Sequence, residues 1–410
     1  MRNRNILFKT LLLLGLSLAG GIEARAQSVI LPPTAVPNTP PAAAAQAPAT
    51  ESTPPSLGAG SPFQWGIISL HPHLFYRLLY GDGLQSAPGQ QLKTTINSIS
   101  LGVLANIGTH WTLDYTPTQT YYSNDAFKDT LDHSVRLLGG TTYENWSFNL
   151  SQTYTSTFTP LIETGQQTGE DNYGTMASAG YHLNDKVQLD TNLAYQARFT
   201  SIFPDSRETT IGERAHYRIA PDVDTSVSLD YGWVNMSEGV DMTYTRPGVQ
   251  VNWKAADKTT VNLEAGYETR RFDTPGAENL NSPTFGAGIQ FQPFPTTSLS
   301  FNANKGVAVS YFTNQVTKNT GWTVSLQQRL LRHYFLSAGY SGQKSSYVST
   351  DPNVTVNRDD RNYGLNVRLS TVFFQRASVA LLYQNTHNKS DNAGYGFTSS
   401  QIGVEIGYQF

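Results

Sequence analysis

Eight tight turns divide most of this chain into hairpins of similar length. They recur about every 35 to 44 residues, near Gly108-Thr109, Glu144-Asn145, Asn184-Asp185, Pro221-Asp222, Ala256-Asp257, Pro295-Thr296, Leu331-Arg332 and Arg376. The connections between them are looser and richer in Gly, Asp, Asn, Ser and Pro, as at Gly81 to Gln90, Pro160 to Asp171, Asp273 to Asn281 and Ser345 to Arg358. This alternation of tight turns and looser connections predicts antiparallel strands that follow one another in chain order.

Within these hairpins apolar and polar residues alternate with the period of a β-strand. The apolar sets expected on the outer face are Ile99, Leu101, Val103 and Ala105; Trp146, Phe148 and Leu150; Val187, Leu189, Leu193 and Tyr195; Val227, Leu229, Tyr231 and Trp233; Phe285, Ala287, Ile289 and Phe291; and Leu365, Val367, Leu369 and Phe373. A soluble β-sandwich would not sort its connections into a short set and a long set, whereas a transmembrane barrel does.

We therefore predict an all-β fold, a transmembrane antiparallel up-and-down β-barrel over residues 61–410. Eight turns and nine loops give about eighteen strands, and an even number brings both ends of the barrel to one side of the membrane. Sixteen strands are the alternative, because Pro247 lies in the segment Met242 to Lys254 and a central strand tolerates proline poorly. The short turns of such barrels face the periplasm, so both termini are expected there.

The composition suits strands whose two faces meet different surroundings. Charged residues make up 14% of the chain, well below the roughly 25% of soluble domains, yet hydrophobic residues reach only 39%. The 22 Tyr, 19 Phe and 6 Trp suit the interfacial belts of membrane barrels. The net charge of -3 gives no reason to expect a nucleic acid partner, and without cysteine there is no disulfide to form.

The first 26 residues have the features of a secretory signal peptide. Basic residues precede the apolar run Leu11 to Ala19, and Ala24-Arg25-Ala26 forms an A-x-A cleavage site before Gln27. The apolar run is shorter than the roughly 20 residues of a membrane-spanning helix. Residues 27–60 are rich in Pro, Ala and Thr, a composition that stays extended or disordered. We expect a periplasmic tether there; binding to the cell wall, binding to a periplasmic partner, or plugging of the pore are alternatives.

The last ten residues, Gln401 to Phe410, carry the alternation to the end of the sequence. An edge strand that ends on apolar residues invites unwanted pairing, and closing the last strand on the first removes that edge. This ending resembles that of bacterial outer-membrane β-barrels, whose last strand ends in Phe after alternating aromatic or aliphatic residues. The resemblance implies that the barrel-assembly machinery reads Ile406, Tyr408 and Phe410 as an assembly signal.

The same alternation predicts which charged residues line the pore. The basic ones are Arg77, Arg136, Arg198, Arg214, Arg218, Lys254, Arg270, Arg329 and Arg368, and the acidic ones are Asp114, Asp190, Asp230, Glu264, Glu268 and Glu405. Nine basic residues against six acidic ones predict a mildly basic lumen. Arg214, His216 and Arg218 stand together on one strand. They bind an anionic solute or polymer, or they are neutralised by acidic neighbours or by water.

Enzymatic and metal sites are not indicated. The sequence contains no H-E-x-x-H and no Cys/His cluster. His71 and His73 share a face with Ser69 and Arg77 but have no carboxylate partner nearby, so we interpret them as pore-lining. The loop residues Asp351, Asp359 and Asp360 could hold a cation, although a hydrated loop is the simpler interpretation. We expect no catalytic residues, no metal and no cofactor.

The size and pattern resemble the outer-membrane β-barrel porin families, which include barrels that accompany exopolysaccharide export in Gram-negative bacteria. The resemblance implies a passive outer-membrane channel for small polar solutes, in contact with outer-membrane lipid. One alternative is an exit barrel for a secreted polysaccharide that works with periplasmic export proteins. Another is a structural or adhesive barrel with a blocked lumen. Since no loop is much longer than about fifteen residues, we expect a fairly open channel without a tight constriction.

Overall fold

The computed structural model describes residues 63–373 and 376–410. The predicted signal peptide, residues 1–26, and the predicted linker, residues 27–60, lie outside the described residues. Within the described ranges no helix is long and apolar enough to cross a membrane. All regular structure there consists of strands, which agrees with the predicted all-β fold.

Nineteen strands make up the structure. Their bounds are β1 Phe63–Trp65, β2 Ile68–Ala87, β3 Gln90–Ile107, β4 Trp111–Tyr122, β5 Thr130–Tyr143, β6 Trp146–Leu161, β7 Gln166–His182, β8 Val187–Thr200, β9 Ser206–Ala220, β10 Val223–Met236, β11 Met242–Ala256, β12 Thr259–Phe272, β13 Leu280–Phe294, β14 Thr297–Val309, β15 Gln315–Leu330, β16 Tyr334–Ser349, β17 Asp359–Phe373, β18 Ala377–Ser390 and β19 Phe397–Gln409.

The strands β2 to β19 form a closed ring. Each strand pairs antiparallel with the next, and β19 pairs with β2, so that Glu405 lies opposite Arg77. Closure gives a barrel of eighteen strands, as the turn spacing predicted. The extra strand, β1, pairs only with the start of β2 and covers the part of its edge that β19 does not reach.

Pro247 fits within β11 because the ladder is interrupted beside it. The β11–β12 register includes Thr245 and Gly248 but skips Arg246 and Pro247. The missing N–H of the proline therefore falls where no ladder bond is made toward β12. The alternative of sixteen strands, which rested on this proline, is wrong.

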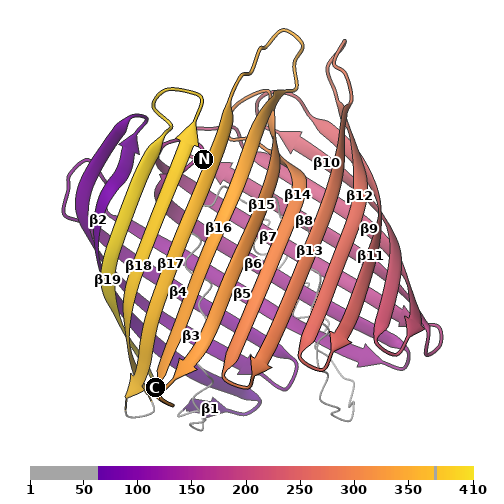
Figure 1. Ribbon diagram of the computed structural model, residues 1–410, viewed down its shortest axis with the longest axis horizontal. Coiled ribbons are helices and arrows are strands. Elements are labelled where there is room, and N and C mark those ends of the chain that lie inside the picture. Colours follow the sequence, from indigo (N-terminus) through magenta and orange to yellow (C-terminus); the bar gives the residue numbers. More distant parts are fainter. Residues whose placement is uncertain (1–62, 374–375) are drawn as a thin grey trace. The chain divides into compact units, whose positions relative to one another are not determined.

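The two ends of the barrel differ as the sequence predicted (Figure 1). Seven of the eight predicted tight turns fall between consecutive strands, and Arg376 directly precedes β18. The C-terminus and β1 lie at this same end, where the Phe410 N–H donates to the carbonyl of Pro72 at 3.0 Å. The longer connections gather at the other end, which we call the loop end.

The outer face is apolar. Side chains such as Leu101, Leu189, Val227, Leu263 and Ile402 are exposed by 45% or more in the isolated chain, and each alternates with a residue that points into the barrel. Such a surface would be unstable in water but is satisfied by the hydrocarbon of a membrane.

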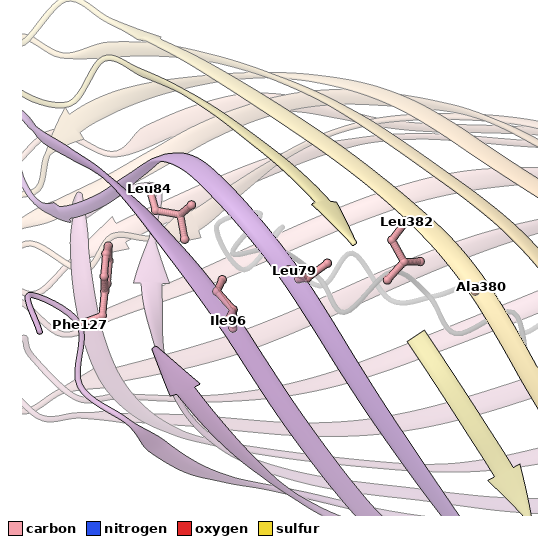
Figure 2. Packing of buried hydrophobic residues seen from close by; sticks show 6 residues of the cluster. All are labelled: Leu79, Leu84, Ile96, Phe127, Ala380 and Leu382. Atoms are coloured by element: carbon pink, nitrogen blue, oxygen red, sulfur yellow. The ribbon is translucent and has the colours of Figure 1, made fainter. Parts of the chain in front are cut away.

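Parts of the inner wall are also apolar, which strict alternation did not predict. One cluster joins Leu79, Leu84, Ile96, Phe127, Ala380 and Leu382 from β2, β3, β18 and the β4–β5 connection (Figure 2). A second cluster, described below, lies against β10 to β13. In both cases the residues contributed by the wall lie on the face that looks into the barrel, where a packed cover rather than lipid shields them from water.

Candidate functional site: the lumen and its closed mouth

The inner face is the candidate functional site, and the register places all of the predicted pore-lining residues on it. They are Arg77, Arg136, Arg198, Arg214, His216, Arg218, Lys254, Arg270, Arg329, Arg368, Asp114, Asp190, Asp230, Glu264, Glu268 and Glu405, each opposite in alternation to the exposed apolar residues of its strand. His71 and His73 share this inner face, and His73 Nε2 lies 3.0 Å from the hydroxyl of Thr116.

The complete inner face is less basic than the sequence predicted. The register adds Arg246 to the basic side, and it adds Asp132, Glu170, Glu208, Asp224 and Asp360 to the acidic side. Nine basic residues plus one give ten, and six acidic residues plus five give eleven. The predicted excess of basic charge came from leaving out these residues, of which Glu170 and Asp360 were assigned to loops.

On one side of the barrel, a carboxylate bridges two arginines. Glu405 accepts hydrogen bonds from Arg77 on β2, at 2.8 Å from its Nε, and forms an ion pair with Arg368 on β17 at 2.7 Å. The Glu405 side chain is only 6% exposed, while the two arginines keep about a quarter of theirs in contact with the lumen, 28% and 25%. The triad joins β2 to β17 across β18 and β19 and leaves an excess of positive charge.

A second network spans β9 to β12. Arg246 binds Asp230 at 2.9 Å, and the buried Arg270 binds Glu268 at the same distance. The Tyr244 hydroxyl, next to both guanidinium groups, donates to Glu208 at 2.6 Å. Buried charges require such partners because an unpaired charge away from water is costly.

His216 contacts two carboxylates, one through each ring nitrogen. Its Nδ1 lies 2.9 Å from Asp224 and its Nε2 lies 3.1 Å from Asp190. Arg214 lies across from Asp190 in the β8–β9 register, and Arg218 lies across from Asp224 in the β9–β10 register. Neither arginine makes an ion pair within 4.0 Å among the described residues. The three predicted basic residues are thus adjacent, but only His216 is held by acids.

The loop aspartates are not brought together. Asp359 points outward and pairs with Lys344, whereas Asp360 points inward and binds Arg358. Asp351 accepts a hydrogen bond from the N–H of Asn353 in its own turn. The arrangement separates the carboxylates by strand alternation.

The tip of the β6–β7 hairpin folds into the barrel mouth. Pairing of β6 with β5 ends at Ser156, and pairing of β7 with β8 begins at Glu170, so the tip between them extends beyond both neighbouring strands. It reaches β2, from which it is separated by several strands in the wall. Pro160, Leu161 and Ile162 line a small pocket together with residues of β2, β18 and β19.

The β6–β7 tip meets a second hairpin that comes from nearly the opposite wall. Glu163 accepts hydrogen bonds from the Ser310 hydroxyl at 2.6 Å and from the Tyr311 N–H at 2.9 Å. Tyr311 in turn donates from its hydroxyl to Glu170 at 2.7 Å. Ser310 and Tyr311 belong to the β14–β15 connection, so one carboxylate fastens the two hairpins together.

The β14–β15 hairpin leaves the wall near its tip. The β13–β14 ladder ends at the pair Phe285–Lys305, although β14 and β15 stay paired as far as Val309–Val316. Val316 would face lipid by alternation, yet it is 0% exposed. The reason is that the hairpin bends inward, so its outer face is covered.

Valines of the bent hairpin form the second inner cluster. Val307 and Val316 pack with Val234, Met242 and Leu280 from the inner face of β10, β11 and β13. Burial of these apolar side chains, at roughly 25 cal/mol per Å², stabilises the inward position of the hairpin. It also explains why the inner face of these strands is apolar near the loop end.

Two arginines complete the closed mouth. Arg358 donates to the carbonyl of Glu163 at 2.9 Å, binds Asp360, and stacks over Tyr395 with 3.9 Å between the guanidinium carbon and the ring centroid. Arg198 lies 3.9 Å from the Tyr311 ring centroid and donates to the carbonyl of Ser310 at 2.8 Å. These contacts join residues of β8 and β17 and of the β6–β7, β14–β15, β16–β17 and β18–β19 connections.

The expectation of a fairly open channel did not foresee that two hairpin tips meet across the mouth. It was based on loop length, but the cover is built from extended strands that bend inward, and a strand extension does not appear in the sequence as a long loop. Glu163 and Arg358 were missed for the same reason. Apolar residues at inward positions, such as Val234 and Leu79, were the available signal that something covers the inner wall.

The predicted assembly residues lie on the outer face at the turn end. Ile406, Tyr408 and Phe410 are 49%, 37% and 46% exposed, and the rings of Tyr408 and Phe410 are in edge contact with centroids 4.7 Å apart. Their side chains point away from the lumen.

Comparison with known proteins adds a family match. The family model described as "Putative beta-barrel porin 2" matches residues 203–410, which is 208 of the 410 residues. No curated protein matches the chain.

Several solved structures resemble the chain at low sequence identity. Pseudomonas aeruginosa OccK2 (OpdF) is 11% identical over 83% of this chain and 98% of that chain, with a TM-score of 0.45. A BenF-like porin from Pseudomonas fluorescens Pf-5 is 11% identical over 83% and 99%, with a TM-score of 0.45. Acinetobacter baumannii OccAB4 is 11% identical over 83% and 98%, with a TM-score of 0.44.

Proposed function

This chain belongs to the outer-membrane family described as "Putative beta-barrel porin 2", and on that premise we propose that it is a gated channel for small polar solutes. Its relatives are channel proteins, so it is not an enzyme. The observation that carries the proposal is the fastening of the two hairpins through Glu163, because a contact of few hydrogen bonds between two otherwise separate hairpins can open and close.

In the closed state the β6–β7 and β14–β15 tips cover the mouth. We propose that solutes pass when the contact between Glu163 and Ser310 breaks and the tips separate. Below the tips, the route runs past the charged networks of the inner wall. Most of these charges are held in pairs, so no group of unpaired charges binds an ion tightly. The pore therefore passes solutes by diffusion.

We propose a slight preference for anions, carried by Arg214 and Arg218 rather than by the lumen as a whole. The acids closest to these arginines are already bound to His216. Arg214 lies opposite Asp190 and Arg218 lies opposite Asp224. Neither guanidinium group is in an ion pair among the described residues, so both can still attract anions from the lumen.

The test is single-channel conductance of the refolded mature protein in a planar bilayer. We expect brief conducting steps separated by long closed periods. A variant in which a tight turn replaces the β6–β7 tip, residues 158–168, should conduct with far fewer closures. Shortening the exposed β12–β13 connection, residues 273–278, is the matched control and should leave the closures unchanged. A folded tip-shortened protein that never conducts would contradict the channel proposal.

A structural or adhesive barrel is the second candidate, and the closed mouth favours it. Such a barrel would stay silent in the bilayer with or without its hairpin tip. An exit barrel for a secreted polysaccharide is a third candidate, supported by the aromatic residues Phe203, Tyr311, Phe312 and Tyr395 at the mouth. Concentration-dependent block of the tip-shortened channel by an acidic oligosaccharide would favour it.

The route to the membrane is also part of this proposal. We propose that residues 1–26 direct secretion and are cleaved after Ala26, that both termini remain in the periplasm, and that residues 27–60 serve as a periplasmic tether. The outward aromatic end of β19 would be recognised by the barrel-assembly machinery. Replacement of Phe410 by Ser should then lower the amount of folded protein in outer membranes of cells while leaving refolding of the purified chain unaffected.

A further inference from the structure

Three basic residues stand directly beside one another on the outer face near the loop end. Lys344 on β16 lies opposite Arg361 on β17, and Arg361 lies opposite Lys389 on β18. Residues directly opposite each other have Cβ atoms roughly 4.5–5.5 Å apart, and like charges in such pairs are destabilising. We call these three residues the basic row.

Two more lysines lie near the basic row. Lys344 lies opposite Thr320 and Lys318 lies opposite Ser346, so Lys318 and Lys344 are diagonal neighbours. In the next pair of strands, Lys305 lies opposite Thr320, which makes Lys305 a diagonal neighbour of Lys318. Diagonal neighbours are roughly 7–8 Å apart. Lys318 also lies opposite Val307, where the β14–β15 hairpin bends inward, so the continuous outer-face charge is that of Lys344, Arg361 and Lys389.

Acidic residues on this part of the outer face do not balance the row. Asp359 pairs with Lys344 at 3.2 Å, with 41% and 48% of the two side chains exposed. No ion pair within 4.0 Å joins Arg361 or Lys389 to an acid in the described part of the chain. On another part of the loop end, by contrast, Lys93 pairs with the adjacent Asp82 at 3.1 Å.

The row lies on the loop-end side of three outward tyrosines. On the same three strands, Tyr340, Tyr363 and Tyr383 are 45%, 37% and 38% exposed. Each lies nearer to the middle of its strand than the basic residue does. Outward aromatic residues mark the boundary between hydrocarbon and head groups in membrane barrels. The basic row is therefore at the level of the lipid head groups, outside the pore.

We propose that the basic row binds the phosphate groups of a lipid in the outer leaflet. Phosphate offers several acceptor oxygens, and guanidinium and ammonium groups are its usual protein partners. One bound phosphate would convert the repulsion between Arg361 and its two neighbours into shared attraction. The proposal depends on the outer-membrane location and on the loop end facing the outside, but not on conduction.

The experiment compares two triple variants. Lys344→Gln/Arg361→Gln/Lys389→Gln removes the row, and Lys93→Gln/Arg207→Gln/Arg271→Gln removes three outward basic residues of the loop end on β3, β9 and β12. Each refolded protein is titrated with bis-phosphorylated lipid A or with the same lipid after phosphate removal, and bound lipid is counted by native mass spectrometry. Urea unfolding in lipid vesicles checks folding, because this measurement does not require the barrel to conduct.

We expect the first variant to bind bis-phosphorylated lipid A about a hundredfold more weakly. Each basic residue near anionic lipid contributes roughly a factor of five in affinity, and the variant removes three of them. The control variant should bind as the natural protein does. Lys344→Arg/Lys389→Arg keeps the positive charges and should retain lipid binding. This variant still tests the proposal if the neutral triple variant does not fold. Equal binding of the dephosphorylated lipid, or equal losses in the two triple variants, would overturn the proposal.

Two further arms separate the proposal from its premises. Millimolar inorganic phosphate should not displace the lipid; full displacement would show a site for free phosphate and overturn the assignment to a lipid. Orientation is tested by placing a single cysteine at Asp351 in this cysteine-free chain and labelling intact cells with an impermeant maleimide. Failure to label would remove the outer-leaflet premise whatever the binding data show.

Discussion

Glu163 accepts a hydrogen bond of 2.6 Å from the hydroxyl of Ser310, although the hairpins that carry the two residues start from nearly opposite sides of an eighteen-strand ring. The contact crosses the barrel mouth. Because it is made by two hairpin tips and not by the wall, it can change without unfolding the barrel, and this makes it the natural site for experiments on gating.

Replacement of Glu163 by Ala should open the mouth. The change removes two hydrogen bonds and leaves the buried Ser310 hydroxyl and Tyr311 N–H without their acceptor, at a cost of about 1–3 kcal/mol for each unsatisfied group. The ratio of open to closed time in a planar bilayer should rise by roughly tenfold or more. Glu238→Ala, at an exposed position of the β10–β11 connection, is the control. Identical gating in the two variants would disprove the role of Glu163.

Acid should favour the closed mouth. Burial raises the pKa of the Glu163 carboxyl above its usual range, and the hydrogen bonds from Ser310 and Tyr311 and the charges of Arg198 and Arg358 oppose this only in part. The closed state binds the Glu163 proton more tightly than the open state. The extra stability that this gives the closed state is fully present below the ordinary Glu pKa, roughly 4.3. It is lost as the pH rises through the raised pKa of Glu163.

The open probability in bilayers should therefore increase as the pH is raised across that interval. Glu163→Gln keeps the acceptor oxygen but cannot ionise, so this variant should remain mostly closed and lose the dependence on pH. Tyr347 and Glu170, which also lie near the contact, are unchanged in it. A pH dependence that persists in Glu163→Gln would assign the effect to another group.

Loss of the Glu405 carboxylate should weaken the barrel at its closing strands. In Glu405→Gln the guanidinium groups of Arg77 and Arg368 would face each other without their shared anion. We expect a loss of about 1–3 kcal/mol in the free energy of unfolding, less than for a fully buried pair because both arginines reach the lumen. Urea unfolding in lipid vesicles measures it. Asp257→Asn, which alters the exposed pair with Lys254, should change stability little.

Arg214 and Arg218 should set the ion preference. Neutralising both, as Arg214→Ala/Arg218→Ala, should shift the reversal potential in a salt gradient toward cations, because neither arginine is held in an ion pair within the described part of the chain and the nearest acids are bound to His216. Lys254→Ala, which removes an inner charge that is already paired with Asp257, should shift the potential less. An unchanged potential in the double variant would show that water and counter-ions neutralise the pair.

The fold could be predicted from the sequence because its determinants are local. Tight turns at regular spacing fixed the hairpins, and alternation with period two fixed which side chains face lipid and which face the lumen. Even the ring closure followed, since an apolar last strand needs a partner. The inward placement of Arg77, Glu405 and the other charged residues rests on the same short-range rule.

The state of the mouth was decided only by tertiary structure. Whether a strand continues in the wall or bends inward depends on contacts between segments far apart in sequence, such as Glu163 with Ser310 and Val316 with Val234. Alternation assigned Val316 to lipid, and only the bend of the β14–β15 hairpin buries it in the barrel. The pairing of inner charges also could not be predicted from the sequence. Arg77 and Glu405 are far apart in the chain, and only the register of the closed ring brings them together.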